Sequence, residues 1–253
     1  MIQISWSKII KFLEKAFLPR ICCCCGDEAV SYDKDPPFCY NCMESWENLS
    51  KAECTFCGKK SNECMCIPRR VRYVTGTTVA WTMFYDSKEN GDMALFFYKM
   101  KNRYDHVLLD YCATRMKNAI ISLCIRKKLH YKDFVVTYTP RKKKSVHVLG
   151  FDHSAKIAQK LAKKLGIEFI VTFENVGKED QKRLGAKKRY ENAKKSYKYI
   201  DGSLKNHKKI FIVDDIMTTG STISVCSSLL LENGAEKVIP VVLAKDNYRK
   251  KEK

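Results

Sequence analysis

Cysteine spacing constrains this 253-residue chain more than any other feature of its sequence. Ten of its 13 cysteines fall between residues 22 and 66, and eight of these form four short pairs. The pairs are Cys22–Cys25, Cys39–Cys42, Cys54–Cys57 and the tighter Cys64–Cys66. Two intervening residues let a tight turn direct both sulfurs at one tetrahedral ion. The pattern therefore predicts metal binding in a small module over residues 22–67.

Eight thiolates suffice for two closed Cys₄ zinc sites, the arrangement of a double zinc ribbon. Gly26 directly follows Cys25, which leaves Cys23 and Cys24 as spacers. The expected ligand sets are Cys22, Cys25, Cys39, Cys42 and Cys54, Cys57, Cys64, Cys66, although a crossed pairing also satisfies the spacing. In a module this short, two structural zinc ions would supply much of the folding free energy.

Two other uses of paired cysteines are open. An iron–sulfur cluster takes the same ligands. Redox-active chemistry needs a single pair before a helix in a βαβ unit, whereas four pairs crowd into 45 residues here. A catalytic zinc is disfavoured, because the segment contains no histidine to complete an open site. Structural zinc is the favoured interpretation.

Residues 1–21 predict a short amphipathic helix. Charged residues such as Lys8 and Lys11 interrupt its apolar positions, so no apolar run exceeds three residues, whereas a signal peptide needs about 7–15. Docking against the protein is favoured over contact with a membrane surface. No segment approaches the ~20 apolar residues of a membrane span. We expect a cytoplasmic protein with reduced thiols and no stable membrane insertion.

Charge points to the class of partner. The net charge is +19, and residues 71–253 carry +18 of it. An excess of this size favours partners that bear phosphate, either nucleotides or nucleic acid. The 45% content of hydrophobic residues excludes wholesale disorder.

Residues 71–250 alternate between strand and helix patterns. Expected strands are 71–85, 134–137, 168–171, 210–213 and 237–243, and expected helices are 91–100, 104–129, 154–165 and 221–232. The polar, basic residues 174–198 predict no element. Such alternation predicts an α/β domain with a parallel sheet flanked by helices.

The most informative motif is IFIVDDIMTTGST, residues 210–222. A buried strand ends at Asp214 and Asp215, where α/β sheets bind ligands. The loop Thr218, Thr219, Gly220, Ser221, Thr222 then enters a helix, so its N–H groups and hydroxyls form a phosphate cradle. Ribose hydroxyls would donate to the two acids. The alternative is that the acids pair with lysines and the loop merely caps the helix, which explains neither the second acid nor the run of hydroxyls.

This motif resembles the phosphoribosyltransferase signature of two acids followed by a threonine-rich loop. Together with the cysteine pairs, it resembles the ComF (GntX-like) family, a double zinc ribbon fused to a type I phosphoribosyltransferase domain. Further similar segments are Tyr98–Lys101, Thr139–Lys142 with Gly150-Phe151, and Gln181–Tyr197. The chain departs from the family pattern at Tyr138-Thr139-Pro140 and Asp152-His153.

The resemblance implies displacement at ribose C1 of phosphoribosyl pyrophosphate, with Mg²⁺ on the leaving pyrophosphate. It assigns Asp214 and Asp215 to the ribose and Thr218–Thr222 to the 5′-phosphate. It also assigns residues 138–142, including Arg141 and Lys142, to the pyrophosphate. The segment 178–198, which contains Arg189, would be a lid, or a solvated loop on composition alone. His147 and His153 fall near this site, where histidines in a basic loop are usually solvated.

Two functions follow from the resemblance. The first is a protein that binds phosphoribosyl pyrophosphate and serves DNA uptake in natural competence, with competence proteins as partners. The second is an active phosphoribosyltransferase of nucleotide metabolism with an unidentified acceptor. Single-stranded DNA is a candidate partner for the basic surface around residues 141–144 and 178–198, where tyrosines interleave with lysines.

Overall fold

The computed structural model describes residues 21–29, 38–85, 91–177 and 186–247. A four-stranded sheet lies at its centre in the order β1 (Ala80–Tyr85), β6 (Lys237–Asp246), β5 (Lys209–Met217) and β2 (Val135–Tyr138). Every pair in this sheet is parallel. Beside it, β3 (Phe173–Asn175) and β4 (Tyr197–Tyr199) form an antiparallel pair. The predicted α/β class is confirmed.

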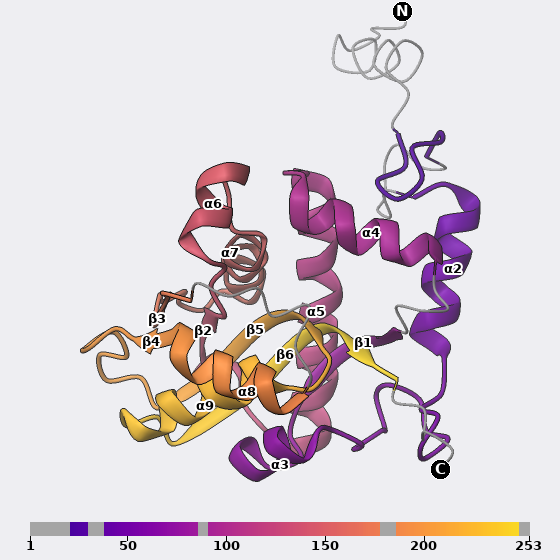
Figure 1. Cartoon of the computed structure of the whole chain (residues 1–253). Coiled ribbons are helices and arrows are strands. Elements are labelled where there is room, and N and C mark those ends of the chain that lie inside the picture. The colour runs from indigo at the N-terminus through magenta and orange to yellow at the C-terminus, as the bar shows by residue number, and fades with distance from the viewer. Residues whose placement is uncertain (1–20, 30–37, 86–90, 178–185, 248–253) are drawn as a thin grey trace, which may run out of the picture.

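Helices cover both faces of the central sheet (Figure 1). One layer contains α2 (Tyr40–Lys51), α4 (Gly91–Asn102), α5 (His106–Lys127) and α7 (His153–Leu165). The other contains α3 (Arg69–Thr75), α8 (Ala186–Ser196) and α9 (Ser221–Glu232), while α6 (Lys143–Leu149) precedes α7 and a short 3₁₀ turn spans Tyr131–Asp133. Burial on both faces explains why residues 210–213 are continuously apolar.

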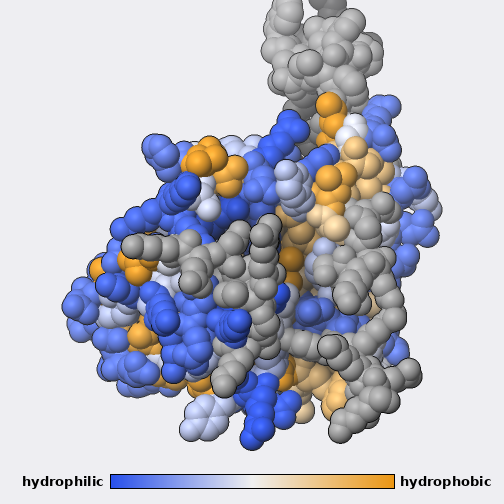
Figure 2. Space-filling view, viewed as in Figure 1, coloured by the Kyte–Doolittle hydropathy of each residue, from blue (hydrophilic) through white to orange (hydrophobic). Residues whose placement is uncertain are grey.

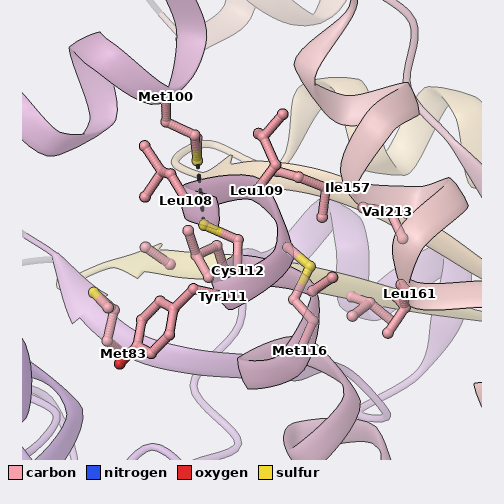
Figure 3. Close-up of a cluster of buried hydrophobic side chains, with 14 of the residues drawn as sticks. Met83, Met100, Leu108, Leu109, Tyr111, Cys112, Met116, Ile157, Leu161 and Val213 are labelled. Atoms are coloured by element: carbon pink, nitrogen blue, oxygen red, sulfur yellow. Dashed lines mark hydrogen bonds between the residues drawn. The ribbon is translucent and has the colours of Figure 1, made fainter. Parts of the chain in front are cut away.

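The apolar stripe of α5 forms the centre of one core layer (Figure 3). Its side chains Leu108, Cys112 and Met116 are at most 1% exposed. The Cys112 thiol lies 3.8 Å from the Met100 sulfur of α4. The stripe follows helical spacing, so its use as core rather than as a cofactor site agrees with the sequence prediction.

The cysteine-rich region packs directly against this layer. Trp46 on α2 lies 5.1 Å from both Phe96 of α4 and Tyr111 of α5, measured between ring centroids. Hydrophobic residues of the face shown in Figure 2 gather around α4 and the cysteine-rich region. The domain boundaries expected from the sequence, 22–67 for the cysteine-rich module and 71–250 for the α/β domain, stay predictions.

Three sequence predictions differ from the structure. Residues 69–75 form α3 rather than strand, because the chain after Pro68 turns so that Val71 is buried. The strand expected at 168–171 is reduced to a single parallel bridge between Phe169 and Val136. Residues 173–199 hold β3, α8 and β4, although composition predicted no element there.

Two predicted features lie largely outside the described residues: the amphipathic helix over 1–21 and the part of the proposed lid at 178–185. Among the helices that the structure describes, none combines the length and apolarity needed to cross a lipid bilayer.

Candidate functional site

The first cysteine cluster brings together Cys22, Cys25, Cys39 and Cys42, whose sulfurs all lie within 4.8 Å of one another. Cys39 precedes the first turn of α2 and Cys42 lies within that turn. The positive end of the helix therefore faces the cluster and favours thiolates. A tetrahedral zinc with Zn–S bonds of ~2.3 Å separates its sulfurs by about 3.8 Å. The Cys25–Cys39 sulfur distance of 3.4 Å is close to that spacing.

The second cluster brings together Cys54, Cys57, Cys64 and Cys66 within the same 4.8 Å limit. Its Cys57 and Cys64 sulfurs lie 3.7 Å apart. In both clusters the turn after the first ligand closes through a backbone hydrogen bond, from Gly26 to Cys22 and from Gly58 to Cys54. The structure thus assembles the uncrossed ligand sets, each with a geometry that suits a tetrahedral metal ion.

One thiol in each cluster is prepared for ionisation. Burial raises the pKa of Cys22, but backbone N–H groups directed at its sulfur bring that pKa down to about 7. The same balance, with help from the N–H groups of Phe56 and Cys57, lowers the pKa of Cys54 to about 7. Burial raises the pKa of Cys25, Cys42, Cys64 and Cys66, so a bound metal would displace protons from these thiols.

Cys23 and Cys24 lie outside both ligand sets and are buried in the core. We expect the variant Cys23→Ala/Cys24→Ala to retain about two zinc ions per chain by elemental analysis, because neither thiol supplies a ligand. The matched variant Cys25→Ala/Cys42→Ala should lose one zinc. Equal loss in both variants, or a visible iron–sulfur absorption, would contradict the assignment.

A second feature is a cavity of about 430 Å³ at the carboxyl ends of β2 and β5. Most residues that the sequence predicted for ligand binding line it, Tyr138 being the exception in the 138–142 segment. The lining candidates are Arg141, Lys142, Arg189, Asp214, Asp215, Thr218, Thr219, Gly220, Ser221 and Thr222. Lys101, Thr139, Ser145, His153, Asn175 and Tyr197 also contribute to its walls. The cavity therefore combines two acids with several cations and hydroxyls.

Asp215 is tightly held within this cavity. Its Oδ2 lies 2.8 Å from the Lys101 ammonium and 2.9 Å from His153 Nε2. Burial raises the pKa of Asp215, but the Lys101 charge and the His153 hydrogen bond outweigh it and hold that pKa well below its usual range. Asp215 is therefore ionised at neutral pH.

Asp214 behaves differently from its neighbour. Burial and the Asp215 charge raise the pKa of Asp214 to about 7, against a weaker lowering by a hydrogen bond with Thr139. The Asp215 backbone N–H donates to Asp214 Oδ1 at 2.9 Å. Asp215 is thus paired as a carboxylate, while Asp214 is protonated more readily than an ordinary aspartate. A hydroxyl donor or a cation at Asp214 would favour its charged form.

The loop at 218–222 meets the start of α9. Gly220 caps the helix at a φ of +69°, and α9 runs for 12 residues from Ser221. The Thr219 and Ser221 hydroxyls lie 2.8 Å apart. The loop contains no acid, so its N–H groups, its hydroxyls and the positive helix end form an environment for an anion.

The Thr139–Lys142 segment is fixed on two sides. The Arg141 N–H donates to Asp152 Oδ2 at 2.7 Å, and the Arg141 guanidinium donates to the Lys101 carbonyl. The Asn175 amide donates to the Pro140 carbonyl at 3.0 Å. These contacts hold the segment from which Arg141 and Lys142 line the cavity.

His153 corrects a sequence expectation. It is 4% exposed and hydrogen-bonded to Asp215, rather than solvated in a basic loop. Asp152 caps α7 by accepting from the N–H groups of Ser154 and Ala155, which fixes His153 at the first position of that helix. The His147 side chain is exposed on α6, as expected.

Lys101 is the main site residue that sequence reasoning did not assign. It lies at the end of α4, far along the chain from Asp215, so no local pattern joins the two. The available signal was the Tyr98–Lys101 segment, whose resemblance was noted without a role for its lysine.

Asp214 should make stability depend on pH. Its native pKa of about 7 lies above the ordinary value near 4, so the native state binds the extra proton and stability falls as pH rises between those values. We expect Asp214→Asn to raise the free energy of unfolding by about 1–3 kcal/mol at pH near 8, with a smaller gain near pH 5.5. Urea denaturation at both pH values checks this. A gain that is equal at the two pH values would contradict it.

Comparison with known proteins agrees with this geometry. Residues 139–253 match the sequence model of the phosphoribosyl transferase domain. No curated protein matches the sequence. A similar solved structure is a hypoxanthine phosphoribosyltransferase from Staphylococcus aureus, which is 14% identical, covers 56% of this chain and 70% of its own, and gives a TM-score of 0.35. The matched segment contains both acids and the loop at residues 218–222, the threonine loop, and it resembles a phosphoribosyl transferase domain.

Proposed function

We propose that this chain binds phosphoribosyl pyrophosphate in the cavity at the ends of β2 and β5. The observation that carries the proposal is the adjacent acid pair Asp214 and Asp215 beside a threonine loop at a helix start, within one cavity. The loop offers donors to a 5′-phosphate, and the acids accept from ribose hydroxyls. The loop alone would accept any small anion, and the acids alone would accept any hydroxyl donor. A sugar phosphate is the ligand that satisfies both.

The cations of the cavity fit the second end of this ligand. Arg141, Lys142 and Arg189 line the same cavity, and a pyrophosphate needs several positive charges. Mg²⁺ prefers oxygen ligands and substrate phosphates, so Asp214, Asp215 and the pyrophosphate are its fitting ligands here. When bound, it would neutralise charge that develops on the leaving pyrophosphate.

Isothermal titration with phosphoribosyl pyrophosphate and Mg²⁺ tests the proposal. We expect saturable binding, weaker binding of ribose 5-phosphate, and still weaker binding of inorganic phosphate, because each lacks part of the contacts. Glucose 1-phosphate is the control for a sugar that carries its phosphate at a different position from ribose 5-phosphate. Equal affinity for all four ligands would reduce the cavity to a general anion site and contradict the proposal.

A screen for pyrophosphate release in the presence of candidate acceptors separates the two functional classes. Release with a purine or pyrimidine base would identify an active phosphoribosyltransferase of nucleotide metabolism. Tight binding without release favours a binding protein. The buried His153 and the partly exposed Lys101 both contact Asp215, and they stabilise the charge of that acid in either case.

We infer that the chain is a ComF-family protein linked to DNA uptake and that it works in the cytoplasm, where thiols stay reduced. Two four-cysteine clusters and a phosphoribosyltransferase domain in one chain support this. Zinc is the proposed metal, since Cys₄ sets without an open position are typical of structural zinc. Competence proteins are the proposed partners.

Single-stranded DNA is the second proposed partner, through exposed lysines of α6 and α8. Base stacking contributes little, because Tyr197 is buried and Tyr190 is covered by Arg70 and Lys194. We therefore expect binding dominated by phosphate contacts, with a log–log salt slope of about −0.7 per contact. Lys144→Gln/Lys188→Gln should make this slope shallower in fluorescence anisotropy. Binding that does not change with salt would remove DNA from the partners.

A further inference from the structure

Helix α3 contacts the threonine loop at its glycine. A Cβ atom on Gly220 would lie 2.3 Å from Val71 Cγ2 and 3.3 Å from the Pro68 ring, so the loop backbone has no room for a side chain there. Val71 is fully buried. The backbone at Gly220 has a φ of +69°, a conformation that glycine adopts without strain. The close contact with α3 and the backbone turn therefore both depend on a glycine at this position.

The same helix begins beside the second cysteine cluster. Cys66, the last ligand, stands two residues before Pro68. The Arg72 guanidinium donates to the Met65 carbonyl at 3.3 Å, which ties α3 back to the turn that carries the cluster. The core around Val71 also contains Cys54 and Cys64. Figure 1 shows α3 beneath the sheet, on the side of α8 and α9.

A second contact reaches the other wall of the cavity. The Arg70 guanidinium lies over the Tyr190 ring of α8, 4.3 Å from its centroid. Tyr190 is adjacent to Arg189, which lines the cavity. One short helix therefore contacts both the threonine loop and a neighbour of a cavity cation.

The sheet holds the second cluster from the opposite side. Lys245 on β6 is 1% exposed, and its ammonium lies 5.0 Å from the Phe84 ring centroid and 5.6 Å from that of Trp81. Cys54 and Cys64 lie within the electrostatic reach of this ammonium. A zinc ion with four thiolates carries two net negative charges, so a buried cation beside it is favourable. Asn247, just after β6, accepts from the Thr55 N–H at 3.0 Å.

We propose that the metal-loaded second cluster holds α3 against Gly220 and so keeps the threonine loop in its anion-binding shape. Pro68 and Val71 are positioning residues, because they touch the loop and not the ligand. The proposal rests on the proposed function of that loop. Without the metal, the second cluster no longer holds α3 in place, and the threonine loop is less ordered before the ligand binds. Ordering the loop on binding then costs free energy, which weakens the affinity.

Affinity for ribose 5-phosphate tests the coupling by calorimetry. We expect Cys66→Ser to bind at least about tenfold more weakly than the zinc-loaded parent, and Cys25→Ser in the first cluster to stay within about threefold. Elemental analysis verifies that each variant retains the other zinc. If the parent binds and both variants lose affinity equally, the coupling is wrong; if the parent does not bind, the proposed function is wrong.

Linkage supplies an independent readout. A ligand that binds better when the second cluster is loaded must in turn tighten metal binding there, by the same factor. We expect saturating ribose 5-phosphate to slow zinc transfer to a chromogenic chelator in Cys25→Ser, where the second cluster alone holds zinc, and to leave it unchanged in Cys66→Ser. Equal rates with and without the sugar phosphate in Cys25→Ser would overturn the proposal.

A double-mutant cycle tests the contact itself. Gly220→Ala should weaken ribose 5-phosphate binding by about tenfold or more, because the added methyl meets Val71 and a positive φ is strained. Adding Val71→Ala frees that space, so Val71→Ala/Gly220→Ala should recover at least about threefold. A merely structural role for Val71 predicts the opposite, namely that the two losses add, and that result would overturn the positioning role.

Discussion

The variant Asp214→Asn/Asp215→Asn should lose measurable binding of phosphoribosyl pyrophosphate while it keeps its fold. Asparagine preserves the shape of each side chain but removes the charge that accepts from ribose hydroxyls and attracts Mg²⁺. Losing two charge-assisted hydrogen bonds at about 1.5–3 kcal/mol each weakens binding by two or more orders of magnitude. Calorimetry measures the affinity, and thermal unfolding monitors the fold.

Stability should change little in this variant because two effects oppose each other. Removing the Asp214 charge relieves its burial and its repulsion from Asp215. Removing the Asp215 charge leaves Lys101 without its partner, but that lysine side chain is 28% exposed and can be hydrated. The matched control is Asp133→Asn/Glu236→Gln, which removes two exposed acids from salt bridges on the surface. Equal loss of binding in the control would indicate a general charge effect and contradict the site.

Removing the proposed zinc ions under reducing conditions should unfold the cysteine-rich region. Binding of a structural zinc contributes about 10–16 kcal/mol in short peptides, more than a region of this size can replace by packing. Trp46 is 1% exposed among Phe38, Phe96 and Tyr111, so its fluorescence should shift to the red and return when zinc is added.

The control for this experiment is treatment with EGTA and added Mg²⁺, at an EGTA concentration at which elemental analysis shows that the zinc stays bound. Emission should then stay unchanged. An unchanged emission after elemental analysis has shown both zinc ions gone would contradict a structural role for the metal. The first cluster should matter most for Trp46, because Cys39 and Cys42 flank the start of α2.

Sequence reasoning succeeded where the chemistry is local. Residues 210–222 contain a strand, two acids, a loop and the start of a helix in one continuous segment. This order is enough to predict that the acids and the loop lie at one end of a sheet. The cysteine pairs are local too, and the structure brings the expected sets together. The roles of these residues stay predictions, since geometry shows proximity rather than binding.

The partners of Asp215 were not accessible in this way. His153 precedes Asp215 by 62 residues, and only the packing of α7 beside β5 brings them together. The helix at 69–75 was missed for a similar reason. Its valine and aromatic content is typical of strands, but burial of Val71 against Gly220 decides its conformation. Contacts between segments far apart in the sequence therefore bring His153 to Asp215 and override the strand preference of residues 69–75.

We expect the threonine loop and the acid pair to hold the two ends of one ribose 5-phosphate unit. A crystal structure of the zinc-loaded protein with ribose 5-phosphate is the decisive measurement. It should show phosphate oxygens at ~3 Å from N–H groups of residues 218–222, with ribose hydroxyls donating to Asp214 and Asp215. A sugar phosphate bound at Arg141 and Lys142, with no phosphate at the loop and Asp215 still bound to Lys101 and His153 alone, would contradict this site.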